Sequence, residues 1–276
     1  MQVAVIADIH GNFEALKAVL NDAFAEGVER IIVNGDLVNR GPSNTAVVKC
    51  LNQAGATIIL GNHEDLIVKW VHRDPSLNKS FFQDPIWCAT GWCARQLEAT
   101  DSIDTLRGLP KASTIESEIG QTVLISHGSP RDYREGFGID MAESKIMEII
   151  EPHKAEVFIG SHTHKGMERN VARRKIINTG SVGAPFDYDT RAAYVIIRSL
   201  RGRWSIEFRR VAYDREAAMT AFETSGFLEE GGVGAQIFLA ELEYARSFFA
   251  PFLKWCSKNG TGSTEANWEA FREGYQ

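Results

Sequence analysis

The sequence predicts a layered α/β protein, and two features of the chain support this prediction. Short apolar runs rich in β-branched residues recur through the first 160 residues, and segments with helical periodicity separate the first three runs. After Gly160 the apolar runs follow one another without intervening helices, which is typical of antiparallel strands. We therefore expect one sheet of strands buried on both faces and a second sheet packed against it.

The first part of the chain contains five expected strands, each continuously apolar and bounded by Gly, Asp, Asn or His. Helices are expected over residues 12–25 and 43–53, since each segment opens with an Asn or Ser suited to helix capping. The stretch 64–109 lacks strand patterns and is rich in Trp and Phe, which predicts a helical insertion over the sheet or its rim. We expect its aromatic side chains to serve packing, with ligand binding as the alternative. The expected strands are 3–7, 30–33, 56–60, 122–126 and 156–159.

The second part of the chain contains four further expected strands, with a turn at Arg201-Gly202. A helical pattern runs from residue 214 to 250 with a break at Gly231-Gly232, and we expect the polar tail 257–276 to be poorly ordered. The chain is therefore expected to divide into a main domain, 1–212, with its insertion at about 64–110, and a helical extension with a polar tail, 213–276. The four strands are 167–171, 175–178, 192–198 and 203–211.

The composition restricts the partners and the compartment. The formal net charge of −6 argues against a nucleic-acid polymer or an anionic membrane as partner, but it allows a small phosphorylated substrate. The four cysteines form no C-x-x-C pair and no disulfide pattern, and the N-terminus lacks the features of an export signal, so we expect a cytoplasmic protein. No apolar run reaches the roughly 18 to 20 residues of a membrane span. The oligomeric state is not predicted.

Metal-type donor residues follow the carboxyl end of each of the first five expected strands. Because those ends line one crevice in an open α/β sheet, the donors are expected to converge. A single Asp or Asn after a strand usually caps a helix or forms a turn, but donors after five strands together indicate a metal site. The residues are Asp8, His10, Asp36, Asn62, His63, His127, His162 and His164.

The donor types favour a pair of divalent ions. Imidazole, amide and carboxylate groups without Cys suit Mn, Fe, Zn or Ni, and these ligand types do not identify which of the four metals binds. A central carboxylate such as Asp36 can bridge two ions about 3.5 to 4 Å apart. Asp8, His10 and His164 are expected at one metal, and Asn62, His127 and His162 at the other.

The donor residues lie in five ordered motifs that resemble those of the calcineurin-like metallophosphoesterase superfamily. The resemblance continues through Asn178 to Gly183, which is similar to a motif of the small bacterial phosphoesterase branch, and covers about residues 1–212. It implies an α/β sandwich of four layers, with two mixed β-sheets packed face to face and flanked by helices, and the same division of ligands between two metals. The motifs are Asp8-Ile9-His10-Gly11-Asn12, Gly35-Asp36, Gly61-Asn62-His63-Glu64, Ser126-His127-Gly128 and Gly160-Ser161-His162-Thr163-His164.

The motifs point to more than one substrate class. Segments 35–42 and 61–64 are closer to protein serine/threonine phosphatases and symmetrical dinucleoside tetraphosphate hydrolases. Asn39, however, stands where the protein phosphatases carry an Asp that pairs with the His at the position of His63. The motif around His127 and the Gly180 region resemble the small bacterial branch instead. The expected substrate is thus a small phosphodiester or phosphomonoester, with a phosphoprotein or a dinucleoside tetraphosphate as the alternative.

The expected chemistry is hydrolysis by a metal-bridging hydroxide, since two cations lower the pKa of a shared water to about 7. His63 is expected to protonate the leaving group or to stabilise the transition state. The alternative is that it only forms hydrogen bonds that support the metal ligands. Arg40 is expected to grip phosphate oxygens, unless it is an ordinary surface residue, and Asn12 to open a helix whose amides face the phosphate. A non-catalytic scaffold of the same fold is a further alternative. The chain carries no P-loop, H-E-x-x-H or G-x-S-x-G motif.

Overall fold

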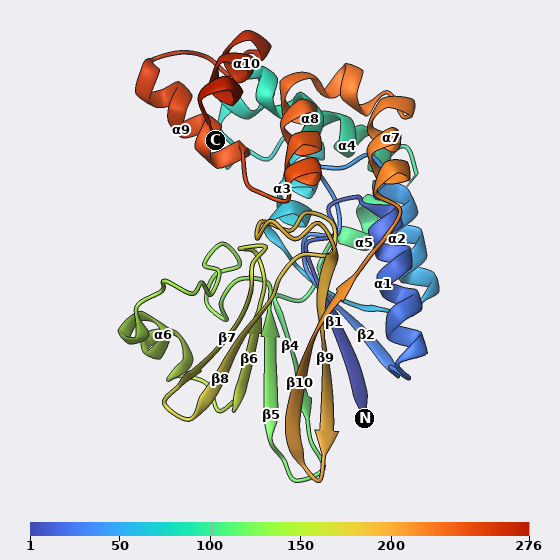
Figure 1. The fold of residues 1–276 in the computed structure, drawn as a ribbon, viewed down its shortest axis with the longest axis vertical. Helices are drawn as coiled ribbons and strands as arrows, with labels where there is room; N and C mark the ends of the chain where they lie inside the picture. Colours follow the sequence, from blue (N-terminus) through green and yellow to red (C-terminus); the bar gives the residue numbers. More distant parts are fainter. Residues whose placement is uncertain (101, 276) are drawn as a thin grey trace.

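The computed structural model describes residues 1–100 and 102–275, which form two five-stranded sheets packed face to face (Figure 1). In the first sheet the strand order is β10-β9-β1-β2-β3. β1 pairs in parallel with β2, and β9 pairs antiparallel to β1. The strands are β1 (Gln2–Ile6), β2 (Arg30–Asn34), β3 (Thr57–Ile59), β9 (Ala192–Leu200) and β10 (Arg203–Val211).

The second sheet has the order β4-β5-β6-β8-β7. Its three central strands are parallel, whereas both edge strands pair antiparallel to their neighbours. Both sheets are therefore mixed, as the resemblance implied. The strands are β4 (Ala112–Glu116), β5 (Thr122–Ser126), β6 (Val157–Gly160), β7 (Gly166–Val171) and β8 (Arg174–Thr179).

The division of strands between the sheets corrects the expectation that the first five strands share one sheet. Strands β5 and β6 belong to the second sheet, and β9 and β10 return to the first. Ala192 to Ile197 of β9 are all buried, so this strand suits an interior position beside β1. Strand β4 was not expected, because only Ile115 of its five residues is buried and an edge strand shows a weak apolar pattern.

Helices complete a sandwich of four layers. The two sheets bury a shared core that includes Val5, Ile125 and Ile159. Helices α1 (Phe13–Ala25) and α2 (Asn44–Gln53) cover the outer face of the first sheet, and α6 (Glu143–Ile150) covers that of the second (Figure 1). Helix α1 buries Leu16, Val19 and Leu20, which repeat with helical periodicity. The carboxyl ends of β1, β2, β5 and β6 meet at one end of this sandwich.

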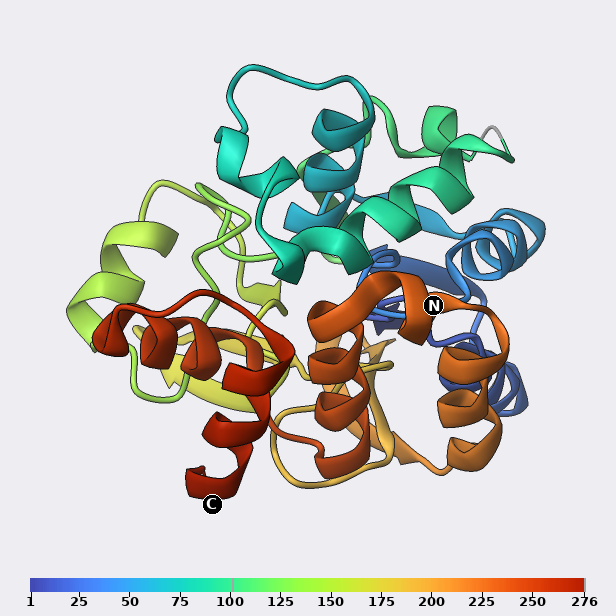
Figure 2. The same ribbon diagram turned by 90° about the horizontal axis from the view of Figure 1, so that it is seen from above.

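Two groups of helices cover that end (Figure 2). One group comes from the insertion and the other from the C-terminal part of the chain, and α4 packs against α8. Within the described residues, no helix combines the length and apolarity needed to cross a membrane. The first group is α3 (Asn62–Val71), η1 (Lys79–Phe82), η2 (Pro85–Trp87), α4 (Cys88–Glu98) and α5 (Ile103–Leu106), and the second is α7 (Arg215–Thr224), α8 (Phe227–Tyr244), α9 (Phe249–Asn259) and α10 (Glu265–Gly274).

The expectation of a poorly ordered tail is wrong for the described residues. Residues 265–274 form helix α10, whose first turn is capped by the Thr264 side chain. Trp268 and Phe271 lie one turn apart and are both buried. Two large aromatic side chains on one helix face supply enough apolar burial to order a segment whose other residues are polar.

Candidate metal centre

The structure brings all eight expected donor residues to one end of the sandwich. Asp8 and His10 follow β1, and Asp36 follows β2. Asn62 and His63 form the first turn of α3. The remaining three donors come from the second sheet, where His127 follows β5 and His162 and His164 follow β6.

The loops that carry these donors have an unusual backbone conformation. Five non-glycine donors have positive φ angles, which costs each residue about 1–3 kcal/mol. Such strain persists where the surrounding structure holds the loop in place, and it is most common at functional sites. The angles are 52° at Asp8, 49° at His10, 54° at Asp36, 66° at His162 and 59° at His164.

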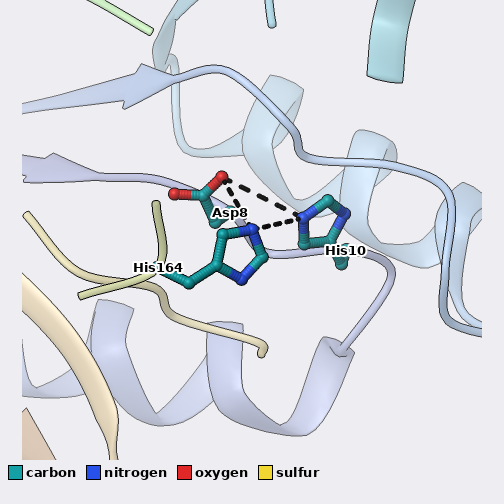
Figure 3. A group of neighbouring side chains, drawn as sticks. All are labelled: Asp8, His10 and His164. Atoms are coloured by element: carbon teal, nitrogen blue, oxygen red, sulfur yellow. Dashed lines mark hydrogen bonds and ion pairs between the residues drawn. The ribbon is translucent and has the colours of Figure 1, made fainter. Parts of the chain in front are cut away.

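One group of donors contains Asp8, His10 and His164 (Figure 3). The Asp8 Oδ1 atom lies 3.4 Å from His164 Nε2 and 4.0 Å from His10 Nε2. The two imidazole Nε2 atoms lie 3.2 Å apart. All three side chains are buried, so these atoms enclose a small polar space within the protein.

A second group surrounds His127. Its Nε2 atom lies 3.2 Å from Asp36 Oδ2 and 3.1 Å from Asn62 Oδ1, and His162 lies in the same cluster. Asp36 Oδ2 is also 3.8 Å from His10 Nε2 in the first group. The Asp36 carboxylate thus lies between the two groups, where the sequence predicted a bridging residue.

The hydrogen bonds of the site fit a cation. Asp8 Oδ1 is buried and has no hydrogen-bond partner, which is costly for a carboxylate oxygen unless a cation approaches it. In three of the histidines Nδ1 contacts a backbone carbonyl: His10 with Val38, His127 with Asn34 and His164 with Ala184. A Nδ1–H that donates to a carbonyl leaves Nε2 as a free lone pair, and all three Nε2 atoms face the site.

The protonation of the site also suits metal binding. Burial lowers the pKa of His162 to about 4 and that of His10 and His164 well below the ordinary value, so these imidazoles are neutral ligands at pH 7. Burial raises the pKa of Asp8 well above its usual range, and neighbouring Asp36 adds to this effect. A carboxyl group with a raised pKa is more stable when it binds a cation or a proton than as an unpaired anion.

Asp36 and His127 form a charged pair in the absence of a cation. Burial opposes ionisation of Asp36, but His127 and His63 beside it hold its pKa well below the ordinary value. Burial likewise opposes protonation of His127, yet Asp36 raises its pKa to about 10. A divalent ion would displace the proton from this pair, so metal binding at this point is expected to release a proton.

His63 lies beside the two groups and has a defined tautomer. Its Nδ1 is 2.8 Å from Asn39 Nδ2, and Asn39 Oδ1 accepts a hydrogen bond from the Arg40 backbone N–H. That second bond fixes the amide orientation, so Asn39 donates to Nδ1 and the His63 proton resides on Nε2. His63 Nε2 lies 3.9 Å from Asp36 Oδ2 and therefore presents its proton to the centre. Burial lowers the His63 pKa to about 3, so its neutral form dominates.

Two residues to which the sequence assigned no role support this centre. Glu64 is fully buried and accepts hydrogen bonds from the backbone N–H groups of Asp36, Leu37 and Gly61. It thereby joins the loop after β2 to the start of α3. Its position three residues after Gly61, as in a capping box, is a sequence signal for such a role. The other residue, Glu241, gave no such signal.

Glu241 binds Arg40. The Arg40 guanidinium pairs with Glu241 of α8 and lies over the rings of Phe186 and Phe238, with 4.8 Å to the Phe238 centroid. Arg40 Nε is buried without a hydrogen-bond partner. The expected phosphate-binding residue is therefore a buried one, held by the C-terminal helices rather than free on the surface.

Asn12 caps helix α1, as the sequence predicted. Its Oδ1 caps α1 by accepting from the Ala15 N–H, and its Nδ2 contacts the Gly183 carbonyl at 3.1 Å and the Tyr213 hydroxyl at 3.3 Å. With its carbonyl oxygen and amide group engaged inside the protein, Asn12 serves the first helix. Its expected role in substrate binding, through the amides of the α1 N-terminus, stays a prediction.

This fold, with buried carboxylates and neutral imidazoles at the ends of its strands, defines a metal-dependent phosphoesterase. The model of the calcineurin-like phosphoesterase family matches residues 1–166. The chain belongs to this family and is a hydrolase that acts on phosphoester bonds. Divalent metal ions are the cofactors that the family and the cluster of His and Asp residues imply.

Several known proteins are similar to the chain over most of its length. It is 29% identical to the uncharacterised protein MJ0912 of Methanocaldococcus jannaschii, with 78% of this chain and 89% of the relative covered. It is 26% identical to serine/threonine-protein phosphatase 2 of Escherichia coli, with 64% and 86% covered. A crystal structure of a metallophosphoesterase from Sphaerobacter thermophilus matches with a TM-score of 0.67 and 26% identity, covering 89% of this chain and 99% of that one.

Proposed function

We propose that this protein hydrolyses small phosphorylated compounds at a centre that binds two divalent ions. The observation that carries the proposal is the Asp36 carboxylate, which lies between the two donor groups. Asp8, His10 and His164 would hold one ion and Asn62, His127 and His162 the other, with Asp36 shared. Manganese, iron, zinc and nickel all suit these ligands.

The side chains around the centre support distinct roles in the reaction. When bound, the ions supply Lewis acidity toward a phosphate oxygen and the attacking water. His63 carries a hydrogen on the nitrogen that faces the centre, so its neutral imidazole is placed to donate a hydrogen bond that stabilises charge on a departing oxygen. Arg40 lies at the edge of the centre, where its charge attracts phosphate. Its pairing with Glu241 orients the guanidinium and limits its movement.

The C-terminal helices are part of this proposal. We treat residues 1–212 as the catalytic domain with its insertion and residues 213–276 as an extension that completes the site, because Glu241 and Phe238 both contact Arg40. The four cysteines are free, and Cys88 is exposed, which supports a reducing compartment such as the cytoplasm.

Metal content and turnover test the proposal together. Purified protein should contain about two divalent ions per chain by elemental analysis, and Asp36→Asn should lower kcat by a factor of about 10² or more. The Asp36→Asn protein should keep its circular dichroism spectrum but bind less metal. Full turnover in Asp36→Asn, or wild-type protein that cannot be loaded with metal, would contradict the shared site.

A phosphoprotein or a dinucleoside tetraphosphate is the alternative substrate, favoured by the similarity to the serine/threonine-protein phosphatase of Escherichia coli and by the motif around Asp36. Manganese-loaded protein should be compared on a phosphomonoester, a phosphodiester, a phosphopeptide and diadenosine tetraphosphate. If only the phosphopeptide or diadenosine tetraphosphate is turned over, this alternative substrate class is correct and the proposed class of small phosphoesters is wrong.

A further inference from the structure

A pocket of about 290 Å³ opens beside the metal centre and is lined on one side by Asn62 and His63. Its other walls come from the rest of the insertion, from the loops after β2 and β5, and from the C-terminal helices. Because His63 is proposed to donate a hydrogen bond to the leaving oxygen, the leaving group of a bound phosphoester extends toward this pocket. The nature of the pocket therefore bears on the substrate class.

Four aromatic rings form a continuous wall of this pocket, defined here as the aromatic wall. Phe81 and Trp87 stack with their centroids 4.3 Å apart, and Trp87 meets Phe249 edge-on at 5.5 Å. Phe249 in turn stacks on Phe238 at 5.5 Å. The wall ends at Arg40, which lies 4.8 Å from the Phe238 centroid. It thus runs from the phosphate end of the site outward.

Three of the four rings of the aromatic wall are partly exposed, whereas Phe238 is buried. Phe81, Trp87 and Phe249 are all half-buried, and each lines the pocket. The sequence favoured packing over ligand binding for the aromatic residues of the insertion, and in the structure Phe81 and Trp87 stack on each other and also line a cavity. Among the described residues that line the pocket none is acidic, whereas Arg40 and Arg134 are basic. A phosphorylated ligand therefore meets no like charge there.

We propose that the substrate is a phosphoester whose leaving group carries a flat aromatic ring, which stacks on the aromatic wall while the phosphate occupies the metal centre. This inference rests on the proposed function and names its substrate class. Stacking of a flat ring on aromatic side chains stabilises binding without requiring hydrogen bonds to the ring. A nucleoside and a simple arene both offer such a ring.

Paired substrates with the same leaving-group chemistry test the proposal. Adenosine 5′-monophosphate and ribose 5-phosphate both release a primary 5′-alcohol and differ in the ring, and benzyl phosphate and ethyl phosphate form a second pair. The manganese-loaded protein should show a kcat/KM at least about tenfold higher for the ring-bearing member of one or both pairs. If the higher kcat/KM is seen in only one pair, the pocket binds the kind of ring in that pair, either a nucleoside base or a simple arene.

Two neighbouring phenylalanines provide a matched pair of variants. Phe81 lines the pocket, whereas Phe82 does not and instead packs against Trp70, with ring centroids 4.6 Å apart. Phe81→Leu should abolish most of the advantage of the ring-bearing substrate, and Phe82→Leu should retain it. Adenosine should also inhibit ribose 5-phosphate hydrolysis competitively in the wild type, and more weakly in Phe81→Leu.

The outcomes separate the two proposals. Equal kcat/KM within both pairs, or equal losses in Phe81→Leu and Phe82→Leu, would overturn the role of the aromatic wall while hydrolysis itself upheld the proposed function. Failure of the metal-loaded protein to hydrolyse any of these four monoesters or the phosphodiester of the earlier comparison would contradict the proposed function, and the substrate class would fall with it.

Discussion

Single residues in this protein act through partners that are distant in the sequence. Arg40 and Glu241 are 201 positions apart, yet they form a pair in which the side chains are only 12% and 1% exposed. The second oxygen of Glu241 accepts hydrogen bonds from the backbone N–H groups of Phe248 and Phe249. This one carboxylate therefore connects the proposed phosphate-binding residue to the start of α9 and to the aromatic wall.

Removal of the Glu241 charge is expected to destabilise the protein. In Glu241→Gln the Arg40 charge stays buried without a counter-charge, which should lower the free energy of unfolding by about 3 kcal/mol. It should also reduce kcat/KM, because the guanidinium loses the contact that orients it. Urea unfolding and steady-state kinetics measure the two effects.

The matched control is Glu230→Gln on the same helix. Glu230 pairs with Arg95, but both side chains are more than half exposed, at 57% and 60%. An exposed pair contributes little, so this variant should behave like the wild type. Comparable losses of stability in the two variants would show that the Arg40–Glu241 pair has no special role.

At the scale of elements, α10 holds the C-terminal helices together. Trp268 lies 5.7 Å from Phe248 and 5.5 Å from Phe252 between ring centroids, and Phe252 and Trp268 are both buried. Phe248 directly precedes Phe249 of the aromatic wall. A residue of this aromatic cluster is thus the sequence neighbour of a residue that lines the pocket beside the metal centre.

Truncation of Trp268 is expected to loosen this part of the molecule. Trp268→Ala removes a buried indole, a change that costs about 3–5 kcal/mol in a core. The amide protons of α9 and α10 should exchange faster by hydrogen–deuterium exchange, whereas those of β1 and β9 should keep their protection. Phe24→Ala, at a side chain that is 51% exposed, is the control. Unchanged protection of α10 in Trp268→Ala would contradict this account.

At the scale of the whole molecule, the metal centre joins the two sheets. Asp8 and Asp36 come from loops of the first sheet, whereas His127 and His164 come from loops of the second. The sheets are also joined by the apolar core between them and by hydrogen bonds such as that from Asn34 Nδ2 to the Ser126 carbonyl. A cation bound by donors from both sheets would therefore stabilise the native sandwich relative to the unfolded chain.

Metal binding should consequently raise the melting temperature. At a manganese concentration about 100 times Kd the gain is about 2.7 kcal/mol, which corresponds to a rise of roughly 5 °C or more in a chain of this size. Differential scanning calorimetry with manganese or with a chelator measures the shift. His127→Ala should lose most of it, and the exposed His72→Ala should keep it. An identical shift in both variants would place the ion elsewhere.

Local sequence predicted most of the elements because their signals are local. The runs that became β1, β2, β5 and β6 are continuously apolar and end at polar donors, so both the strands and the positions of Asp8, Asp36 and His127 could be inferred. The membership of β9 in the first sheet could not, since strand pairing depends on contacts between residues such as Val3 and Ile197 that are far apart in the chain.

The amino-acid sequence by itself determined which residues are donors, the order of their motifs and the family to which the chain belongs, because motif spacing and apolar periodicity are properties of short segments. Tertiary structure alone decided that Glu241 holds Arg40 and that rings from the insertion and the C-terminal helices form one wall. These contacts join segments that no local pattern connects, and only the packing of the helices over the ends of the strands brings them together.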